Sequence, residues 1–230
     1  MKILCLALIG LTGIGASARA EVSSAEADRL NAAATALRDI RSSPDKGISE
    51  DLFKKAECVA VIPGLKKAGL GIGGEYGKGV VSCRNGQAWG APAFLEMEKG
   101  SIGLQIGGEQ TDLVLLVMNK TGLDKLLGDK VNLGADMSVA AGPVGRDAAA
   151  STDGKMTAQI LAYSRSKGAF AGIDLSGGSL RPDTKANEAA YGAGMKARDI
   201  VNEPKAKAPQ AAAGFLRALA SDSRGTSGKK

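Results

Sequence analysis

A helical pattern of apolar residues follows the first 20 residues of the chain. Apolar side chains recur there at three- and four-residue spacing, at Ala27, Leu30, Ala34, Leu37 and Ile40. Because this is the spacing of one face of an amphipathic helix, residues 24–41 are predicted to be helical. A second, shorter helix is predicted over residues 48–57, with Ser49 as its N-cap.

Strand-like runs then follow almost without interruption, at residues 58–62, 68–75, 79–84, 87–95, 101–108 and 112–118. Leu113 to Met118 is apolar at both parities, which predicts a central strand buried on both faces. Pro63-Gly64 and Asn85-Gly86 predict turns, and the Asn-Gly pair favours a tight hairpin between Val81 and Trp89.

The second half of the chain is predicted to contain shorter elements. Thr121 and Asp124 are spaced like a capping box and predict a short helix through Leu127. Alternation over residues 131–139 predicts a half-buried strand. The remaining predictions are strands at 158–164 and 169–175 joined by a hairpin at 166–168, a helix capped by Asp183 or Thr184 that ends at Tyr191, and a weak helix at 211–220.

Glycine is concentrated between Gly69 and Gly90, where it occupies eight of 22 positions. In an extended strand, residues 68–80 place most of these glycines on one face and the larger side chains on the other. Because glycine weakens a strand, such a row indicates close approach of another backbone or of a ligand. The segment 69–75 partly recurs as 103–109. Together these patterns predict an α+β fold, in which one β-rich domain forms a twisted sheet or partial barrel with a packed glycine seam and helices at both ends.

The first 20 residues have the pattern of a secretory signal peptide. Lys2, an apolar run from Ile3 to Ile14, and Ala18-Arg19-Ala20 precede Glu21, and this order is typical of a cleaved signal. The apolar run is too short to cross a bilayer, which needs about 20 residues. We therefore expect a soluble periplasmic or secreted protein whose signal is cleaved near Ala20.

The excess positive charge lies near the end of the chain. From Lys196 onward there are eight basic and three acidic residues, whereas residues 21–195 contain 20 basic and 21 acidic residues. The predicted organisation is therefore a signal over 1–20, a nearly neutral domain over 21–195, and a basic, partly disordered tail over 196–230. A neutral domain does not support a nucleic-acid partner.

Two cysteines follow the signal, Cys58 and Cys83, each at the edge of a strand-like run. In an oxidising compartment such a pair is more often bridged than free, and two free buried thiols are the alternative. The predicted disulfide closes a loop of about 25 residues, which contributes roughly 3 kcal/mol in the chain-entropy model.

The sequence contains little that indicates catalysis. It has no histidine, which removes the usual base of serine and cysteine hydrolases and the commonest zinc ligand. Gly69-x-Gly71-x-x-Gly74 matches a dinucleotide fingerprint as a string, but a strand-like segment follows it where a helix is needed. Ser164-Arg165-Ser166-Lys167 and Lys120-Thr121-Gly122 resemble β-lactamase motifs in the wrong order. We predict no enzymatic activity, no metal and no cofactor.

Basic residues near predicted turns are the candidates for contact with an anionic lipid headgroup. They are Lys66, Lys67, Lys78, Arg84, Arg146, Arg165 and Lys167. Residues 142–147 could bind an anion through exposed amides and Arg146, although an ordinary turn is the commoner form of such a segment. The helix over 24–41 could lie on a membrane, but its alanine-rich face favours packing on the domain.

Several segments, in this order, share their sequence character with one family: Ala56–Pro63, Lys67–Gly79, Trp89–Phe94, Gln105–Gly107, Ala141–Arg146, Tyr163–Gly172 and Asn187–Gly192. They resemble the SYLF domain family, also known as the Ysc-type actin-patch family, over about residues 38–194. The resemblance implies a β-rich domain with peripheral helices and no known enzymatic activity.

The resemblance also implies a type of ligand. Eukaryotic members bind membranes that contain phosphoinositides, some bind actin, and in some an N-terminal amphipathic helix contributes to membrane binding. Residues 24–41 occupy the matching place, but they are rich in alanine and follow an apparent export signal. We therefore expect a non-catalytic module of the cell envelope that binds an anionic lipid or membrane surface. A structural or protein-interaction component without lipid binding, with an unknown protein partner, is the alternative.

Overall fold

The structure is a computed structural model of the 230-residue chain, and it describes residues 22–43, 47–103, 109–144, 158–166, 169–170, 174–202 and 206–221. Its centre is a mixed sheet with the strand order β5-β9-β3-β1-β4-β7-β6, to which β2 is added by pairing with β1 and β8 by pairing with β7. The strands are β1 (Cys58–Asn85), β2 (Ala88–Trp89), β3 (Ala93–Gly103), β4 (Glu109–Val117), β5 (Val131–Asn132), β6 (Val139–Ala141), β7 (Ile160–Ser166), β8 (Ala169–Phe170) and β9 (Gly178–Pro182).

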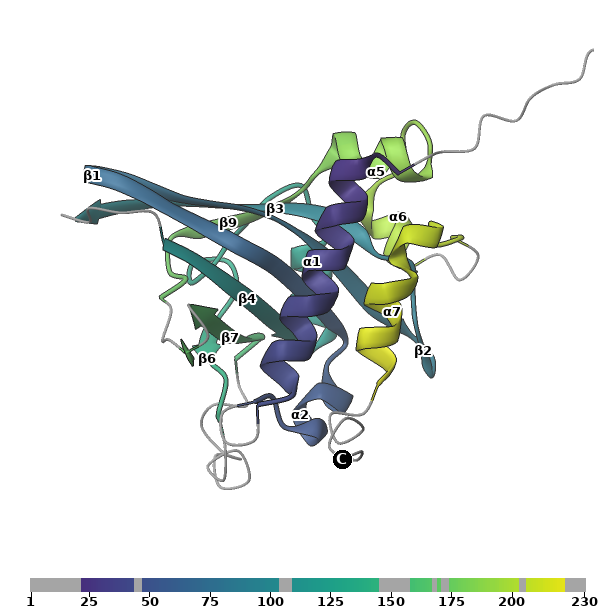
Figure 1. Cartoon of the computed structure of the whole chain (residues 1–230), viewed down its shortest axis with the longest axis horizontal. Helices are drawn as coiled ribbons and strands as arrows, with labels where there is room; N and C mark the ends of the chain where they lie inside the picture. The colour runs from purple at the N-terminus through teal and green to yellow at the C-terminus, as the bar shows by residue number, and fades with distance from the viewer. Residues whose placement is uncertain are drawn as a thin grey trace, which may run out of the picture.

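Helices lie around this sheet and confirm the predicted α+β class. They are α1 (Ser24–Arg41), α2 (Glu50–Lys55), α3 (Lys120–Leu126), α5 (Thr184–Tyr191), α6 (Ala197–Asn202) and α7 (Ala213–Ala220), the last preceded by a 3₁₀ turn at Gln210–Ala212. Figure 1 shows the sheet curling in space, with α1 and α7 side by side across one of its faces. Helices α6 and α7, which follow residue 195, contribute buried side chains such as Ile200 and Phe215.

Alternation along the strands divides the apolar residues between two buried clusters. Val114 and Leu116 of β4 lie in a cluster with α1 and α7, whereas Leu113, Leu115 and Val117 lie in a cluster with α3 and α6. Because both faces of β4 are covered, all five side chains are fully buried. This confirms the predicted central strand.

Helix α1 begins and ends where the sequence pattern predicted. Ser23 caps it by accepting the backbone N–H of Glu26, and Leu30, Leu37 and Ile40 on its apolar face are fully buried. The face is completed by alanines, which allow close packing on the sheet and α7. Burial of this face is the main reason that the helix is held on the domain.

Strand β1 doubles back on itself. Cys58–Lys67 pairs with β4, and Gly71–Val81 pairs with β3. The Cα atoms of Cys58 and Cys83 are 4.0 Å apart, whereas a straight strand would separate them by about 80 Å. The two parts of β1 therefore lie against each other, with the Arg84 N–H donating to the Glu57 carbonyl at 2.8 Å.

The glycine row is found where the two parts of β1 meet. A Cβ on Gly79 would lie 2.4 Å from the Val61 carbonyl oxygen, and one on Gly77 would lie 2.5 Å from Ile62 Cγ2. Because neither position has room for a side chain, the predicted seam is confirmed at these two glycines. The two glycine-rich segments also meet, since Gly71 pairs with Gly103. The side chains of residues 68–72 lie outside the described part of the chain.

Short-range signals identified several caps and hairpins correctly. The Asn85-Gly86 turn joins β1 to β2, with Gly86 at φ +65°. Ser49 caps α2, and Asp183 caps α5 by accepting the Ala186 N–H. β7 pairs with β8 as the predicted hairpin requires, and the predicted weak helix near the end of the chain is α7.

Other predicted boundaries were wrong. Asn119, not Thr121, caps α3, because it directly precedes the helix and its Oδ1 accepts the Gly122 N–H at 2.8 Å. The strand predicted over 87–95 is interrupted at residues 90–92, where Pro92 has no N–H to donate. The helix predicted over 48–57 is shorter, at Glu50–Lys55. The end of the predicted 101–108 strand and residues 171–173 of the 169–175 strand lie outside the described residues.

The strand predicted over 131–139 is also interrupted. Val131, Leu133 and Met137 are buried as the alternation predicted. However, Gly134 adopts φ +89°, and Asp136 accepts the Asn132 N–H at 2.7 Å. These features form a turn between β5 and β6, because a left-handed glycine and a local Asx hydrogen bond reverse the chain.

Candidate functional site

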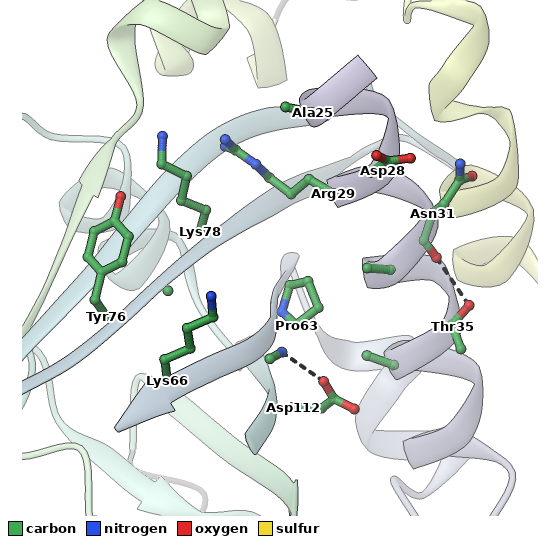
Figure 2. A pocket seen from close by; sticks show the side chains of 14 residues that line it. Ala25, Asp28, Arg29, Asn31, Thr35, Pro63, Lys66, Tyr76, Lys78 and Asp112 are labelled. Carbon is green, nitrogen blue, oxygen red and sulfur yellow. Dashed lines mark hydrogen bonds between the residues drawn. The ribbon is translucent and has the colours of Figure 1, made fainter. Parts of the chain in front are cut away.

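A groove of about 810 Å³ lies between α1 and β1 (Figure 2). Its lining residues are Ala25, Asp28, Arg29, Asn31, Ala32, Thr35, Ala36, Pro63, Gly64, Lys66, Tyr76, Gly77, Lys78 and Asp112. Helix α1 supplies mostly small and polar side chains, whereas β1 supplies two lysines and a tyrosine. The groove is therefore partly apolar, with positive charge on its β1 side.

A β-bulge in β1 places Lys66 on this groove. The pairing of β1 with β4 shifts register between Ile62 and Leu65, and both of these residues lie in the cluster on the far side of the sheet. Gly64 adopts φ +58°, and its N–H donates to Asp112 Oδ1 at 2.9 Å. A bulge changes the alternation of side chains beyond it, so Lys66 lies on the α1 side. Pro63-Gly64 was predicted to be a turn; it is instead an irregularity within β1, where proline is tolerated.

The same bulge directs Lys67 away from the groove. Lys67 Nζ lies 3.4 Å from Glu75 Oε1, and Glu75 is almost completely buried. Glu75 shares its strand face with Gly77 and Gly79, so this ion pair belongs to the seam. Consecutive strand residues face opposite sides in any case, and the extra residue decides that Lys66, not Lys67, is the one that faces the groove.

Two of the groove's cations belong to an ion-pair network that fastens α1 to the sheet. Arg29 Nη1 and Lys78 Nζ each lie 3.0 Å from Asp183 Oδ2, and Lys78 Nζ also lies 3.0 Å from Glu96 Oε1. Arg29 falls away from the apolar stripe in the sequence pattern, but it is buried, and its guanidinium lies 5.1 Å from the Phe94 ring centre. The network joins α1, β1, β3 and the start of α5.

The network shifts the pKa values of its members. A hydrogen bond to Asp183 raises the pKa of Lys78. Burial acts to raise the pKa of Asp183, but hydrogen bonds from Lys78, the Ala186 N–H and Arg29 outweigh it and hold that pKa below its usual value. The pKa of Glu96 is also lowered, since hydrogen bonds from Lys78 and Arg181 outweigh its burial. These groups therefore stay charged at neutral pH and hold one another in place.

Lys66 and Tyr76 are more accessible to a ligand than Arg29 and Lys78, which belong to the ion-pair network. Lys66 is exposed and takes part in none of the salt bridges found among the described residues. Tyr76 is 41% exposed, and its hydroxyl donates to Glu96 Oε1 at 3.2 Å. Burial and the nearby Glu96 charge raise the pKa of Tyr76, so the ring stays neutral. An ammonium group and an aromatic ring thus lie beside small apolar residues, an arrangement suited to an amphiphilic anion.

The described part of the chain contains no group of three or more His, Cys, Asp or Glu side chains that could hold a metal. Ser164 and Ser166, from the β-lactamase-like string, are buried in β7. Among the helices described, none combines the length and apolarity needed to cross a membrane.

The seven basic residues singled out from the sequence are distributed over separate places. Lys66 and Lys78 line the groove, and Lys67 pairs with Glu75. Arg165 Nη1 lies 2.8 Å from Asp39 Oδ2, and Arg84 lines a different pocket. Arg146 and Lys167 lie outside the described residues.

Sequence reasoning did not place Arg29, Tyr76 or Asp183 in the candidate site. Tyr76 carried a usable signal, because it alternates with the seam glycines and so must share a strand face with Lys78. Asp183 was recognised only as a helix cap. Its ion pairs join residues more than 100 positions apart, which no local pattern could indicate.

Comparison with known proteins identifies the family. A family model described as "Ysc84: Las17-binding protein actin regulator" matches residues 98–222, more than half of the chain. The chain belongs to the Ysc84 family. This confirms the SYLF family recognised from the sequence segments, and the matched residues run from β3 to just beyond α7.

Relatives of this Ysc84-family chain align beyond that range. Protein YSC84 of Saccharomyces cerevisiae is 34% identical over 181 residues, covering 77% of this chain and 38% of the relative. LAS seventeen-binding protein 3 of the same species is 35% identical over 163 residues, covering 69% and 35%. SH3 domain-containing YSC84-like protein 1 of Mus musculus is 32% identical over 164 residues, covering 70% and 48%. The chain thus spans about a third to a half of the length of these relatives.

The Ysc84-family chain has a second pocket, of about 730 Å³, between α2, the β1–β2 turn and the end of α7. Its lining residues are Arg41, Glu50, Phe53, Lys54, Arg84, Gln87, Ala88, Trp89, Leu216, Leu219, Ala220 and Ser221. The Arg84 guanidinium lies 4.2 Å from the Trp89 ring centre, and that of Arg41 lies 3.9 Å from the Phe53 ring centre. The two rings are 5.8 Å apart, so arginines and aromatic rings stack together.

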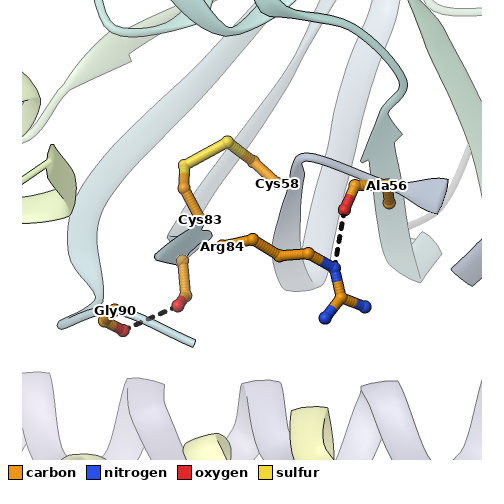
Figure 3. The surroundings of a disulfide bond; sticks show 6 residues. Ala56, Cys58, Cys83, Arg84 and Gly90 are labelled. Carbon is orange, nitrogen blue, oxygen red and sulfur yellow. Dashed lines mark hydrogen bonds between the residues drawn. A yellow bond between two sulfur atoms is a disulfide. The ribbon is translucent and has the colours of Figure 1, made fainter. Parts of the chain in front are cut away.

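The predicted disulfide lies next to this pocket. Cys58 and Cys83 are joined and buried, and they link the two parts of β1. Figure 3 shows the side chain of Arg84 extending from the residue after Cys83 towards Ala56. Its Nε donates to the Ala56 carbonyl at 3.0 Å. Burial lowers the pKa of Arg84, Glu57 opposes that shift and Arg41 adds to it.

Proposed function

We propose that this chain is a non-catalytic module that binds an anionic lipid or membrane surface through the groove between α1 and β1. The observation that carries the proposal is that Lys66 and Tyr76 both line one groove. Lys66 has no salt-bridge partner among the described residues, and Tyr76 is the exposed large hydrophobic side chain in that part of the molecule. A headgroup phosphate would meet the ammonium group, while acyl or glycerol carbons would meet the ring and the alanines of α1.

Vesicle co-sedimentation at low salt tests the groove. We expect the protein to bind phosphatidylglycerol vesicles and to bind phosphatidylcholine vesicles much more weakly. Lys66→Glu should weaken binding roughly tenfold, because each basic residue at an anionic surface contributes on the order of 1 kcal/mol and the variant reverses a charge. Tyr76→Ser should weaken binding less.

Lys130→Glu is the matched control, since Lys130 is exposed and does not line the groove. It makes the same change in net charge away from the proposed site. Equal binding of the two vesicle types, or equal loss in the Lys66 and Lys130 variants, would contradict the proposal.

We also propose that the protein is exported to the cell envelope. The support is the pattern of Lys2, the apolar run from Ile3 to Ile14, and Ala18-Arg19-Ala20. Intact-mass measurement of protein recovered outside the cytoplasm should give a chain that begins at Glu21. A cytoplasmic chain that retains residues 1–20 would contradict export without affecting the lipid proposal.

A protein-interaction role is the second candidate. It is favoured by the relatives named for binding LAS seventeen, and it predicts a site for a peptide rather than for a vesicle. The two candidates need not use the same surface.

A further inference from the structure

We propose that the pocket between α2, β2 and α7 binds an acidic peptide segment of a partner protein, with Arg84 receiving a carboxylate and Trp89 packing against a neighbouring apolar side chain. Among the described residues, three cationic side chains, Arg41, Lys54 and Arg84, line the pocket, against one carboxylate, Glu50. The excess of positive charge complements an acidic partner.

Glu50, the carboxylate among the described lining residues, is already engaged. Arg41 Nη2 lies 2.8 Å from Glu50 Oε1, and Arg41 Nη1 donates to the Ala218 carbonyl at 2.8 Å. Arg41 is buried, and its Nε has no hydrogen-bond partner among the described residues. Arg41 therefore ties α1 to α7 and α2, and its pairing with Glu50 leaves Lys54 and Arg84 as the uncompensated cations of the described lining.

Arg84 retains unused donors. A guanidinium has five N–H groups, and those of Arg84 form described hydrogen bonds only to the neutral carbonyls of Ala56 and Phe53. Among the described residues, no salt bridge joins it to a carboxylate. Stacking on Trp89 holds the planar group in one orientation. Such a fixed, partly exposed fork suits bidentate binding of a carboxylate.

The rest of the pocket fits a peptide better than a bilayer. Leu216 and Leu219 provide apolar contact. At the end of α7 the Arg217 and Ala218 carbonyls accept the Ser221 N–H and Arg41 Nη1, whereas the carbonyls of the last two helical residues form no hydrogen bond among the described residues. These carbonyls can accept backbone N–H groups. A recess with one buried arginine receives a projecting side chain, whereas a flat headgroup layer requires cations that project outwards.

Trp89 makes the proposal directly measurable, because it is the only tryptophan in the chain. The probes are two end-blocked hexapeptides, one alternating glutamate with leucine and one alternating glutamine with leucine. Fluorescence of the full-length protein should change saturably with the glutamate peptide and much less with the glutamine peptide. Arg84→Gln should weaken binding roughly tenfold or more, and Arg84→Lys should be intermediate because it keeps charge but loses the fork.

Lys130→Gln, which lies in the lining of neither pocket, is the control and should bind the peptide normally. Because Arg84 also supports its surroundings, Lys54→Gln provides a second test at an exposed position and should weaken peptide binding severalfold. Equal response to both peptides, or unchanged binding in both the Arg84→Gln and Lys54→Gln variants, would overturn the proposal. So would phosphatidylglycerol vesicles that shift Trp89 fluorescence in an Arg84-dependent way, since the occupant would then be a membrane. Loss of vesicle binding in Lys66→Glu alone concerns only the other groove.

Discussion

The groove between α1 and β1 and the pocket between α2 and α7 contain the same kinds of side chain but differ in how their charges are paired. Between α1 and β1, Arg29 and Lys78 share Asp183, and Lys78 also contacts Glu96. Between α2 and α7, the donors of Arg84 meet neutral carbonyls, and Glu50 contacts Arg41. Most positive charge in the first groove therefore maintains the fold, whereas the second contains a guanidinium that no described carboxylate pairs with. The number of basic residues does not distinguish the groove from the pocket; the difference lies in whether the basic side chains contact carboxylates or neutral carbonyls.

The largest expected effect tests whether the charges of the first groove are structural. Asp183→Asn removes the shared partner of Arg29 and Lys78 while retaining a side chain that can cap α5. Because Arg29 is buried and would keep only the more distant Glu26, whose Oε1 lies 3.7 Å from Nη2, we expect a loss of about 3 kcal/mol in the free energy of unfolding at neutral pH. Urea denaturation of the wild-type protein and the variant measures it.

The stabilisation that Asp183 provides should depend on pH in a definite direction. The pKa of Asp183 is lowered in the folded protein, so its contribution is present above the unfolded carboxyl pKa of about 4 and is lost as pH falls through the lower folded value. The stability difference between wild type and Asp183→Asn should therefore shrink as the pH is lowered from about 5 to about 2. A difference that is constant over this range would show that the network does not stabilise the fold through charge.

The disulfide should affect the two grooves unequally. Joint replacement Cys58→Ala and Cys83→Ala should lower the free energy of unfolding by about 3 kcal/mol. Because Arg84 follows Cys83 directly, the emission of Trp89 should also change, whereas vesicle binding through Lys66 should persist. Reductant should reproduce the stability loss in the wild-type protein and have no effect on the double variant. A reductant effect of equal size in both would exclude the disulfide as its cause.

The glycine seam supports the β1 side of the first groove, and Gly79→Ala tests it. The added Cβ would lie 2.4 Å from a backbone carbonyl oxygen that cannot rotate away, so the two parts of β1 must separate. We expect a loss of about 2 kcal/mol by thermal or urea denaturation. Gly100→Ala on β3 is the control, since a Cβ there meets no atom within 4 Å, and it should be neutral or slightly stabilising.

Much of the fold could be predicted from the sequence because it depends on local periodicity. The 3.6-residue spacing defined α1 at its observed bounds, and the continuous apolar run of β4 indicated burial on both faces. The seam glycines indicated close packing of backbones, and the Asn-Gly pair identified the β1–β2 turn. Each of these signals lies within about 20 residues of sequence and therefore survives without knowledge of the tertiary fold.

The candidate site was less predictable because it depends on register and long-range pairing. One bulge beside Gly64 decides that Lys66 faces the groove and Lys67 the seam. A strict alternation of side chains along a strand cannot predict where such an extra residue is inserted. Asp183 meets Arg29 across 154 positions. Arg84 was one of the predicted lipid-headgroup candidates, and only the fold places it beside Trp89 and Arg41 instead of beside Lys66.

The smallest expected effects are those of neutralising Arg84 or Lys66 on the free energy of unfolding, and they compare the two sites most directly. Arg84→Gln removes two hydrogen bonds to carbonyls and the stacking on Trp89, so it should reduce the free energy of unfolding by about 1 to 2 kcal/mol. Lys66→Gln should change it by less than about 0.5 kcal/mol, since Lys66 is exposed and forms no salt bridge among the described residues. Urea denaturation at low and high salt measures both variants.

This pair of variants separates the two ways in which a cation can be available to a ligand. Lys66 is available because nothing described holds it, so its affinity for an anion includes the loss of side-chain entropy on ordering. Arg84 is available although it is held, so its orientation is already established before a ligand arrives. If Lys66→Gln proved as destabilising as Arg84→Gln, Lys66 would be part of the structural network. The first groove would then lack the unengaged cation on which vesicle binding depends.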